Sequence, residues 1–223
     1  MIYAVSDIHG CYDKYAAMLD KIGISDGDTL YVLGDAADRG RDGIKVLLDM
    51  MERRNVVPVA GNHESMAADV LGPIVSNPGG DMDGEAYLLW MYNGGGPTLS
   101  AFFDLDEVQR RRVVSYLGSF ILRTTVSAGG RKFHLSHTLP PYVPGRKIED
   151  APHRNFLWGK ADYGKVYADG TLFVTGHTPT VAIDPAYKGK IYSKNGHICI
   201  DCGAVFGGRL GCVCLDTLEE FYI

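Results

Sequence analysis

The sequence predicts an α/β fold, because short strands alternate with amphipathic helices at its start. Two apolar runs that include β-branched residues, Ile2–Val5 and Thr29–Leu33, have the length of buried strands. Each is followed by a polar turn and then by a stretch with apolar residues at helical spacing, Tyr12–Ile22 and Asp42–Arg53. Such alternation indicates βαβ units. At 223 residues, with 46% hydrophobic and 22% charged residues, the chain suits one folded domain over residues 1–223.

The rest of the chain predicts further strands and a helical insertion. Four more apolar runs predict strands: Val56–Ala60, Lys132–Leu135, Thr171–Thr175 and His197–Ile200. A mainly helical insertion is expected over about 64–118, from Glu64–Asp69, Glu85–Tyr92, Thr98–Phe103 and Glu107–Leu117. The second half predicts a hairpin of Phe120–Val126 and Arg131–His137 with its turn at 127–130, and late strands at Leu210–Leu215 and Glu219–Tyr222.

Charge and hydropathy argue against nucleic-acid and membrane partners. The formal net charge is -5, whereas general nucleic-acid binding needs a basic face. No charge-free apolar run approaches the ~18 residues that a membrane helix needs, and the start MIYAVSDIHG lacks the pattern of a signal peptide. We therefore expect a cytoplasmic protein, and its oligomeric state stays open.

The cysteine spacing allows a zinc site but favours free thiols. Cys199 and Cys202, with Cys212 and Cys214, form a C-x2-C and a C-x-C pair. However, Cys212 and Cys214 alternate with Val213 in an apolar run typical of a strand. Free thiols in a reducing compartment are the simpler interpretation.

Polar residues follow five of the predicted strands, usually beside glycine. They are Asp7 and His9, Asp35, Asn62 and His63, His137, and His177. Ligands of open α/β sheets bind beyond the carboxyl ends of strands, so these residues are expected to converge. Carboxylates, imidazoles and an amide suit Mn, Fe, Zn, Co or Mg, and six potential ligands favour two ions over one.

For each residue taken alone, a purely structural interpretation also exists. Asp and Asn after strands often form turns, and a lone histidine is more often a core or surface residue, which is how we interpret His134, His153 and His197. Independent turns give no reason for D-x-H-G, G-D-x-x-D-R-G, G-N-H-E and G-H-T-P to occur together at strand ends. The repetition favours a site.

These motifs resemble the signature of the calcineurin-like metallophosphoesterases. The D-R-G of Asp38-Arg39-Gly40 and the N-H-E of Asn62-His63-Glu64 resemble the Ser/Thr protein phosphatase branch, in its small bacterial and phage type. The resemblance extends to Asn93-Gly94-Gly95-Gly96 and to the segment from Ile200 to Phe206, and so spans nearly the whole chain. It implies an α/β fold of two packed mixed β-sheets flanked by helices.

The resemblance also implies the metal ligands. Asp7 and His9 would bind one ion, Asp35 would bridge two, and Asn62, His137 and His177 would bind the second. Two divalent ions, less two carboxylates and a bridging hydroxide, leave the site near +1, which attracts phosphate. The hydroxide would attack phosphorus in line, and Mn²⁺ is the ion expected first.

Four residues are expected to bind the phosphate ester or to take part in protonating its leaving group. Arg39 would bind two phosphate oxygens, because a guanidinium presents paired donors, and Asn62 would add a substrate contact. His63 would protonate the leaving oxygen, with Asp38 orienting its ring. Glu64 is expected only to complement the helix dipole.

Two places depart from the family pattern. The family usually has a second phosphate-binding arginine two residues after a tryptophan, where this chain has Lys160 after Trp158. A lysine gives charge without the planar fork, and Arg154 is an alternative. His137 is followed by Thr138, where the family more often has Gly or Ala.

The preferred function is hydrolysis of phosphoserine and phosphothreonine in proteins, extending to small phosphate esters. One alternative is symmetrical hydrolysis of dinucleoside polyphosphates, whose enzymes usually have alanine in place of Asp38. Another is a catalytically silent binding module, but such relatives tend to lose ligands and all six are present.

Overall fold

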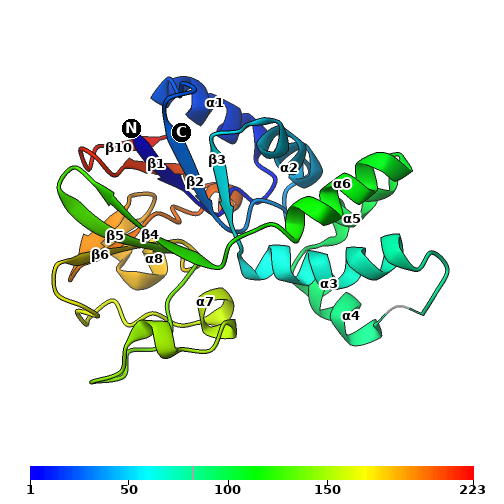
Figure 1. Ribbon diagram of the computed structural model, residues 1–223. Coiled ribbons are helices and arrows are strands. Elements are labelled where there is room, and N and C mark those ends of the chain that lie inside the picture. The colour runs from blue at the N-terminus through cyan, green and yellow to red at the C-terminus, as the bar shows by residue number, and fades with distance from the viewer. Residues whose placement is uncertain (82) are drawn as a thin grey trace.

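The computed structural model describes residues 1–81 and 83–223, and ten of its strands form two packed five-stranded sheets (Figure 1). The first has the order β10-β9-β1-β2-β3 and the second β4-β5-β6-β8-β7. Helices flank both sheets, so the α/β class with two mixed sheets is confirmed.

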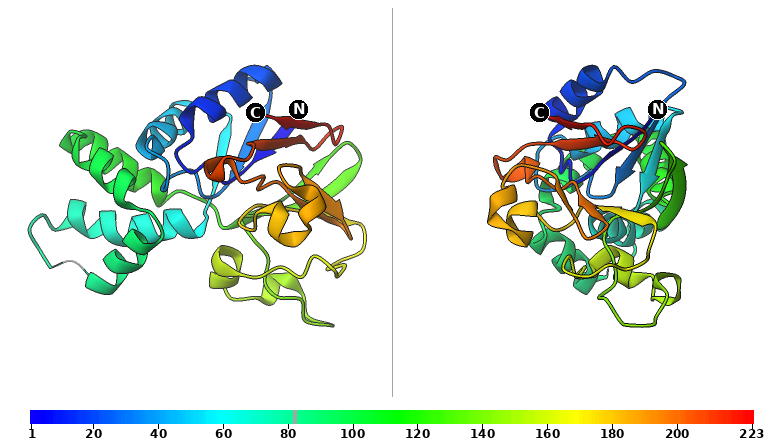
Figure 2. Two further views of the ribbon diagram at one scale, coloured as in Figure 1. Left: turned by 180° about the vertical axis from the view of Figure 1, so that it is seen from behind. Right: turned by 90° about the vertical axis from the view of Figure 1, so that its left-hand side faces the viewer.

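The first sheet is built from both ends of the chain. Its strands are β1 (Ile2–Val5), β2 (Thr29–Leu33), β3 (Val56–Val59), β9 (Gly211–Cys214) and β10 (Glu220–Tyr222). The parallel order of β1, β2 and β3 follows from two βαβ units through α1 (Tyr12–Ile22) and α2 (Gly43–Glu52). Strand β9 runs antiparallel to β1 and β10 antiparallel to β9, so both ends of the chain belong to this sheet (Figures 1 and 2).

The second sheet comes from the second half of the chain. Its strands are β4 (Arg123–Ala128), β5 (Arg131–Ser136), β6 (Thr171–Thr175), β7 (Tyr192–Lys194) and β8 (His197–Cys199). Strands β5, β6 and β8 are parallel, and antiparallel β4 and β7 close the two edges.

Side-chain alternation assigns the two faces of β1. Tyr3 and Val5 join Tyr15 of α1 and Leu47 of α2 in one apolar cluster, whereas Ala4 faces Phe133 and its neighbours between the sheets. One face of the first sheet therefore packs on helices and the other on the second sheet.

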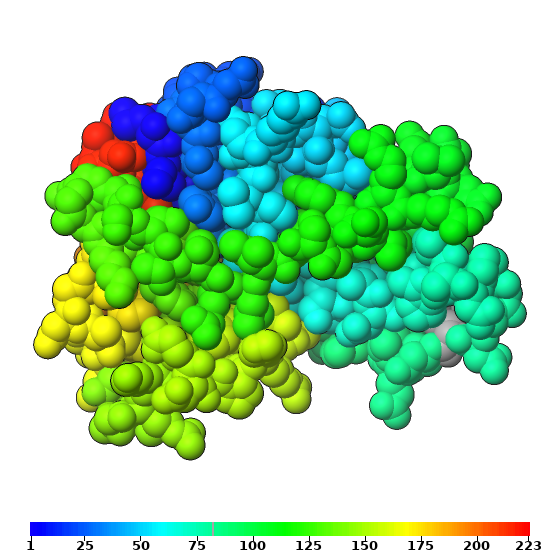
Figure 3. Space-filling view, in the orientation of Figure 1, coloured from blue at the N-terminus to red at the C-terminus, as the bar shows by residue number. Residues whose placement is uncertain are grey.

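Four helices form an insertion between β3 and β4. They are α3 (Asn62–Ser76), α4 (Gly84–Tyr92), α5 (Gly96–Phe103) and α6 (Glu107–Leu117). They form the cyan and green part at the right of Figures 1 and 3. Their buried side chains, including Trp90 and Phe102, belong to the same cluster as Tyr3 and Leu47.

The predicted helix Glu64–Asp69 is too short. Helix α3 continues to Ser76: Val70 and Leu71 are buried, and after Gly72 and Pro73 the partly buried Ile74 and Val75 still pack on the same apolar cluster. The ends of the other predicted elements shift by at most three residues.

The predicted turn of the β4–β5 hairpin is also wrong by two residues. Ala128 pairs with Arg131, which leaves Gly129 and Gly130 as the turn. Both have positive φ, 53° and 74°, as two-residue hairpin turns require. A side chain at Gly129 would lie 2.0 Å from the carbonyl oxygen of Asp216.

The shortest elements were not predicted from the sequence, because they have too few residues to show a period. They are β7, α7 (Arg154–Trp158), α8 (Thr180–Ile183) and the 3-10 turns Ile148–Asp150, Pro185–Tyr187 and Ala204–Phe206. In the described residues we find no helix with the length and apolar character to cross a membrane.

Candidate active site

The polar residues after five strands meet where the two sheets come together. Two hydrogen bonds join the sheets at this place. The ring Nδ1 of His137, after β5, donates to the Leu33 carbonyl at 2.8 Å, and the backbone N–H of His177, after β6, donates to Asp7 Oδ2 at 2.9 Å. The close approach leaves no room beside Gly34, where an added Cβ would lie 2.7 Å from His137 Nδ1.

The backbone of the site is conformationally unusual. Eight non-glycine residues between 1 and 81 or 83 and 223 have φ between 46° and 69°. Six of them are candidate site residues: Asp7, His9, Asp35, Asp38, Arg39 and His177. Left-handed backbone is uncommon for residues other than glycine, although Asp and His adopt it more readily than most, and it accumulates at functional sites. Six such residues at one edge support a functional role for it.

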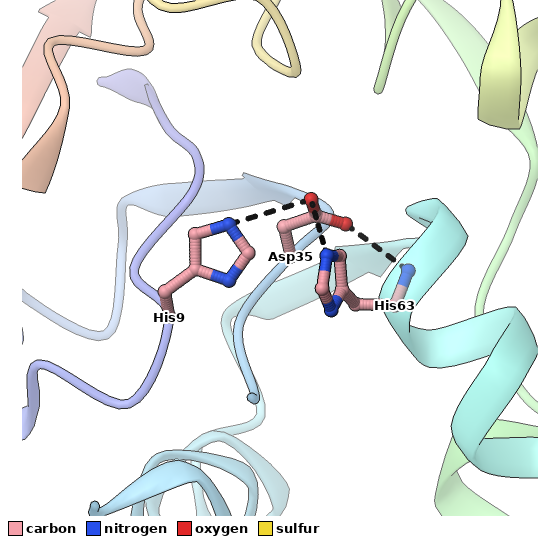
Figure 4. Close-up of side chains that lie close together, drawn as sticks. All are labelled: His9, Asp35 and His63. Atoms are coloured by element: carbon pink, nitrogen blue, oxygen red, sulfur yellow. Dashed lines mark hydrogen bonds and ion pairs between the residues drawn. The ribbon is translucent and has the colours of Figure 1, made fainter. Parts of the chain in front are cut away.

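Asp35 lies at the centre of the first cluster of donor atoms. Its Oδ2 lies 3.5 Å from His9 Nε2 and 3.8 Å from His63 Nε2, and its Oδ1 accepts the backbone N–H of His63 (Figure 4). His9 Nδ1 donates to the Ala37 carbonyl, so the lone pair of His9 is on Nε2 and faces the cluster.

The second cluster adds two histidines and an amide. His137 Nε2 lies 3.4 Å from Asp35 Oδ1, 3.1 Å from Asn62 Oδ1 and 2.9 Å from His177 Nδ1. Because Nδ1 of His137 is the donor to Leu33, its Nε2 carries a lone pair toward these atoms. The close approach of several acceptors is what a cation would satisfy.

Burial sets the protonation states. It lowers the pKa of His177 to about 4 and the pKa values of His9 and His137 well below their usual range. These rings are therefore neutral near pH 7. Burial also raises the pKa values of Asp7 and Asp35, because their charged forms lack solvation, and a nearby cation would offset that penalty. The donor set fits divalent metal ions.

A buried carboxylate, that of Asp38, binds the Nδ1 side of the His63 ring. His63 Nδ1 donates to Asp38 Oδ2 at 2.7 Å, and both side chains have no exposed area. Its Nε2 faces Asp35 and has no hydrogen-bond partner among the described residues. A buried imidazole nitrogen without a partner is costly, and at a site of this kind it is available for a reacting group.

Arg39 reaches the same cluster from the loop after β2. Its guanidinium contacts His9 Nε2 and stacks on Phe206, with Cζ 5.4 Å from the ring centroid. Its backbone N–H donates to the Gly94 carbonyl, and a Cβ on Gly94 would lie 2.9 Å from Arg39 Cγ. Glycine at 94 is thus what lets the chain pack on Arg39.

The structure gives Glu64 a larger part than the sequence analysis expects. Its buried carboxylate accepts the backbone N–H groups of Gly61, Asp35 and Ala36 at 2.8–3.0 Å. Glu64 does lie in the first turn of α3, but it also holds the loop that carries Asp35. The motif G-N-H-E includes it, although spacing alone does not reveal these contacts.

Asp201 was missed as a member of the site. It is buried after β8, close enough to Asp7 for their charges to interact, and burial raises its pKa to about 6. Its Oδ1 accepts the Gly203 N–H at 3.0 Å. The I-D-C-G stretch that resembles the family was the available signal.

Lys160 is not joined to the cluster. Its side chain is exposed, and no hydrogen bond or ion pair in the described parts of the chain links it to the other site residues. Arg154 lines a cavity of about 390 Å³ with Ser65, Leu89, Leu157 and Trp158. The notch between the α7 segment and α3–α4 at the lower edge of Figure 3 lies in this region.

The other interpretations agree with the structure. Cys212 and Cys214 lie on β9, and the five cysteines are free thiols. His134 packs between aromatic rings, His197 bonds the Lys165 carbonyl, and His153 is exposed.

The chain is similar to curated proteins with two different names. Over 213 residues the chain is 26% identical to Serine/threonine-protein phosphatase 2 of Salmonella typhimurium, covering 89% of this chain and 88% of the relative. Over 103 residues it is 33% identical to the symmetrical bis(5'-nucleosyl)-tetraphosphatase of Neisseria meningitidis, covering 40% of this chain and only 36% of that relative.

Fold and family agree. A metallophosphoesterase from Sphaerobacter thermophilus superposes with a TM-score of 0.57 at 17% identity, covering 99% of this chain and 86% of the other. The family model described as calcineurin-like phosphoesterase matches residues 1–199. With strand-end motifs, paired sheets and a matching model over most of its length, the chain belongs to the calcineurin-like phosphoesterase family.

Proposed function

We propose that this protein is a two-metal phosphoprotein phosphatase that hydrolyses phosphoserine and phosphothreonine esters. The observation that carries the proposal is the buried pair of His63 and Asp38. The Nε2 atom of His63 has no hydrogen-bond partner among the described residues and faces the donor cluster around Asp35. A serine or threonine alkoxide is a poor leaving group, and a held imidazole is the kind of acid that it needs.

Six residues would hold two divalent cations, with Mn²⁺ preferred: Asp7, His9, Asp35, Asn62, His137 and His177. When bound, such cations supply Lewis acidity and lower the pKa of water. Asp35 has one oxygen toward each cluster, which supports a bridging position.

The remaining steps belong to side chains of this chain. Arg39 would bind two phosphate oxygens with its guanidinium, whose direction is limited by Phe206. His63 would donate a proton from Nε2 to the leaving oxygen, while Asp38 keeps the other ring proton on Nδ1 and stabilises the imidazolium. We further propose that residues 1–223 act as one domain, since one apolar cluster joins α3–α6 to the first sheet.

A second candidate is symmetrical hydrolysis of dinucleoside polyphosphates. The higher identity over 103 residues to a relative with that name favours it. The phosphatase is preferred because the similarity to Serine/threonine-protein phosphatase 2 extends over nearly the full length of both chains, and because Asp38 is present to orient His63.

The test is metal analysis of the purified protein, followed by a substrate panel. Phosphoserine peptide, p-nitrophenyl phosphate and diadenosine tetraphosphate are compared by kcat/KM with Mn²⁺ present. We expect phosphate release from the peptide to exceed ADP release from the dinucleotide. The reverse order would assign the second candidate, and metal binding without turnover of any ester would indicate a silent binding module.

A further inference from the structure

A tryptophan of the helical insertion contacts the carboxylate behind His63. Trp90 lies in α4, 52 positions from Asp38, and its side chain is fully buried. Its indole Nε1–H donates to Asp38 Oδ2 at 2.7 Å, the oxygen that also accepts the Nδ1–H of His63 at 2.7 Å. An indole N–H can only donate, so Trp90 cannot accept the Nδ1 proton of His63, and that proton stays bonded to Asp38.

Glycine at position 95 makes room for this indole. A Cβ on Gly95 would lie 2.5 Å from Cε2 and 2.6 Å from Nε1 of Trp90. The backbone N–H of Gly95 also donates to the Trp90 carbonyl at 3.0 Å. Gly94 and Gly95 therefore have different roles, one against Arg39 and the other against Trp90.

The next helix, α5, holds the backbone of Asp38. Thr98 Oγ1 in α5 accepts the backbone N–H of Asp38 at 2.9 Å. The second oxygen of Asp38, Oδ1, has no hydrogen-bond partner within the described residues. The orientation of the carboxylate thus depends on the two donors that share Oδ2.

We propose that Trp90 is a positioning residue for proton donation by His63, so that α4 forms part of the apparatus for difficult leaving groups. The proposal rests on the role of His63 in the proposed function. Without the indole N–H, the Asp38 carboxylate can turn about its terminal bond, and His63 loses its fixed direction toward the leaving oxygen. Esters that leave without protonation do not need that direction.

The first variant is Trp90→Phe, which keeps an aromatic ring and removes the donor. We expect kcat on phosphoserine peptide to fall about 10- to 100-fold, within the range of general-acid help, while kcat on p-nitrophenyl phosphate falls less than about threefold. The KM values should hardly change. The matched control is Tyr92→Phe, which removes one polar group from a ring on the same helix at a site that is 91% exposed.

A double variant separates positioning from general packing. In a His63→Asn background, Trp90→Phe should have no further effect on the ratio of the two kcat values, because Trp90 acts through His63. Gly95→Ala, which displaces the indole, should reproduce the bias of Trp90→Phe. If Trp90→Phe does not fold, Gly95→Ala carries the same comparison.

A spectrum tests the contact without turnover. The chain has two tryptophans, so the indole region of a ¹H–¹⁵N spectrum has two signals, and one should shift strongly on Asp38→Asn. Equal losses on both esters, or a loss that persists without His63, would overturn the proposal. If His63→Asn shows no leaving-group bias, the proposed function fails; if it shows the bias and Trp90→Phe does not, only the role of Trp90 fails.

Discussion

His137 Nε2 lies 2.9 Å from His177 Nδ1; the first ring is completely buried and the second is partly buried. The other ring nitrogen of His137 donates to Leu33, so only His177 can supply a proton between the two rings. Their low pKa values favour neutral rings. A cation bound to both nitrogens would replace that single proton with two coordinate bonds, and Asp35 would be its shared carboxylate.

This geometry predicts different metal losses from two substitutions. Asp35→Asn should remove more metal than His177→Ala, because Asp35 oxygens approach His9 on one side and His137 on the other. The measurement is bound Mn²⁺ per chain after dialysis. The control is His153→Ala, at an exposed histidine.

Chelation gives the corresponding activity result for the unmodified chain. Turnover should be lost on metal removal and return with Mn²⁺. Two metals per chain in both variants at the wild-type rate would contradict the assignments, as would full activity after complete metal removal.

Replacement of His63 should affect esters according to their leaving groups. His63→Asn should reduce kcat on phosphoserine peptide by about 100- to 10,000-fold, since a serine alkoxide must be protonated as it leaves. The p-nitrophenyl ester should lose clearly less, and Asp38→Asn should show the same bias more weakly. Equal losses on both esters would move His63 to phosphate or metal positioning.

If Lys160 contacts phosphate, its replacement by arginine should strengthen substrate binding. Thr138 Oγ1 donates to the Gly159 carbonyl at 3.2 Å, which keeps the Lys160 segment beside the residue after His137. Lys160→Arg should lower KM for phosphate esters, because a bidentate contact replaces a point charge. Lys165→Arg, at an exposed lysine, is the control. An unchanged KM for every ester would exclude Lys160 from the site and direct attention to Arg154.

Glu64 should matter to stability far more than an ordinary acidic residue at a helix start. Glu64→Gln should lower the free energy of unfolding by about 2 kcal/mol or more, since an amide accepts through one oxygen only and hydrogen bonds to charged groups are strong. Glu85→Gln makes the same change in the first turn of α4 at an exposed residue. Urea denaturation compares them. Equal small effects would mean that Glu64 acts on the helix dipole alone.

The core strands and the residues that follow them could be predicted from the sequence, because their signals are local; the roles of these residues as metal ligands stay predictions. Asp7 and Asp35 follow neighbouring parallel strands of the first sheet, so the pairing of these strands brings them together. His177 follows β6 of the second sheet, and its approach to Asp7 depends on how the two sheets pack. Trp90 and Glu64 are different. Their partners, Asp38 and the N–H groups near Asp35, lie 52 and about 29 positions away, so only the packing of α3 and α4 reveals the contacts.

Acid should destabilise the fold in part through His134, which lies on β5 between Phe156 and Phe173. Burial lowers its pKa to about 4, and its Nε2 has no hydrogen-bond partner among residues 1–81 and 83–223. The unfolded chain, with an ordinary histidine pKa near 6.5, therefore binds more protons between pH 6.5 and 4, so stability falls as the pH falls through that window. Between pH 7 and 5 the contribution of this one ring is at most about 2 kcal/mol. His134→Phe removes the titration while keeping a ring among aromatic neighbours, so its unfolding free energy should decline less over the same interval. Urea midpoints at the two pH values measure the difference, and parallel declines in both proteins would show that His134 does not titrate on unfolding.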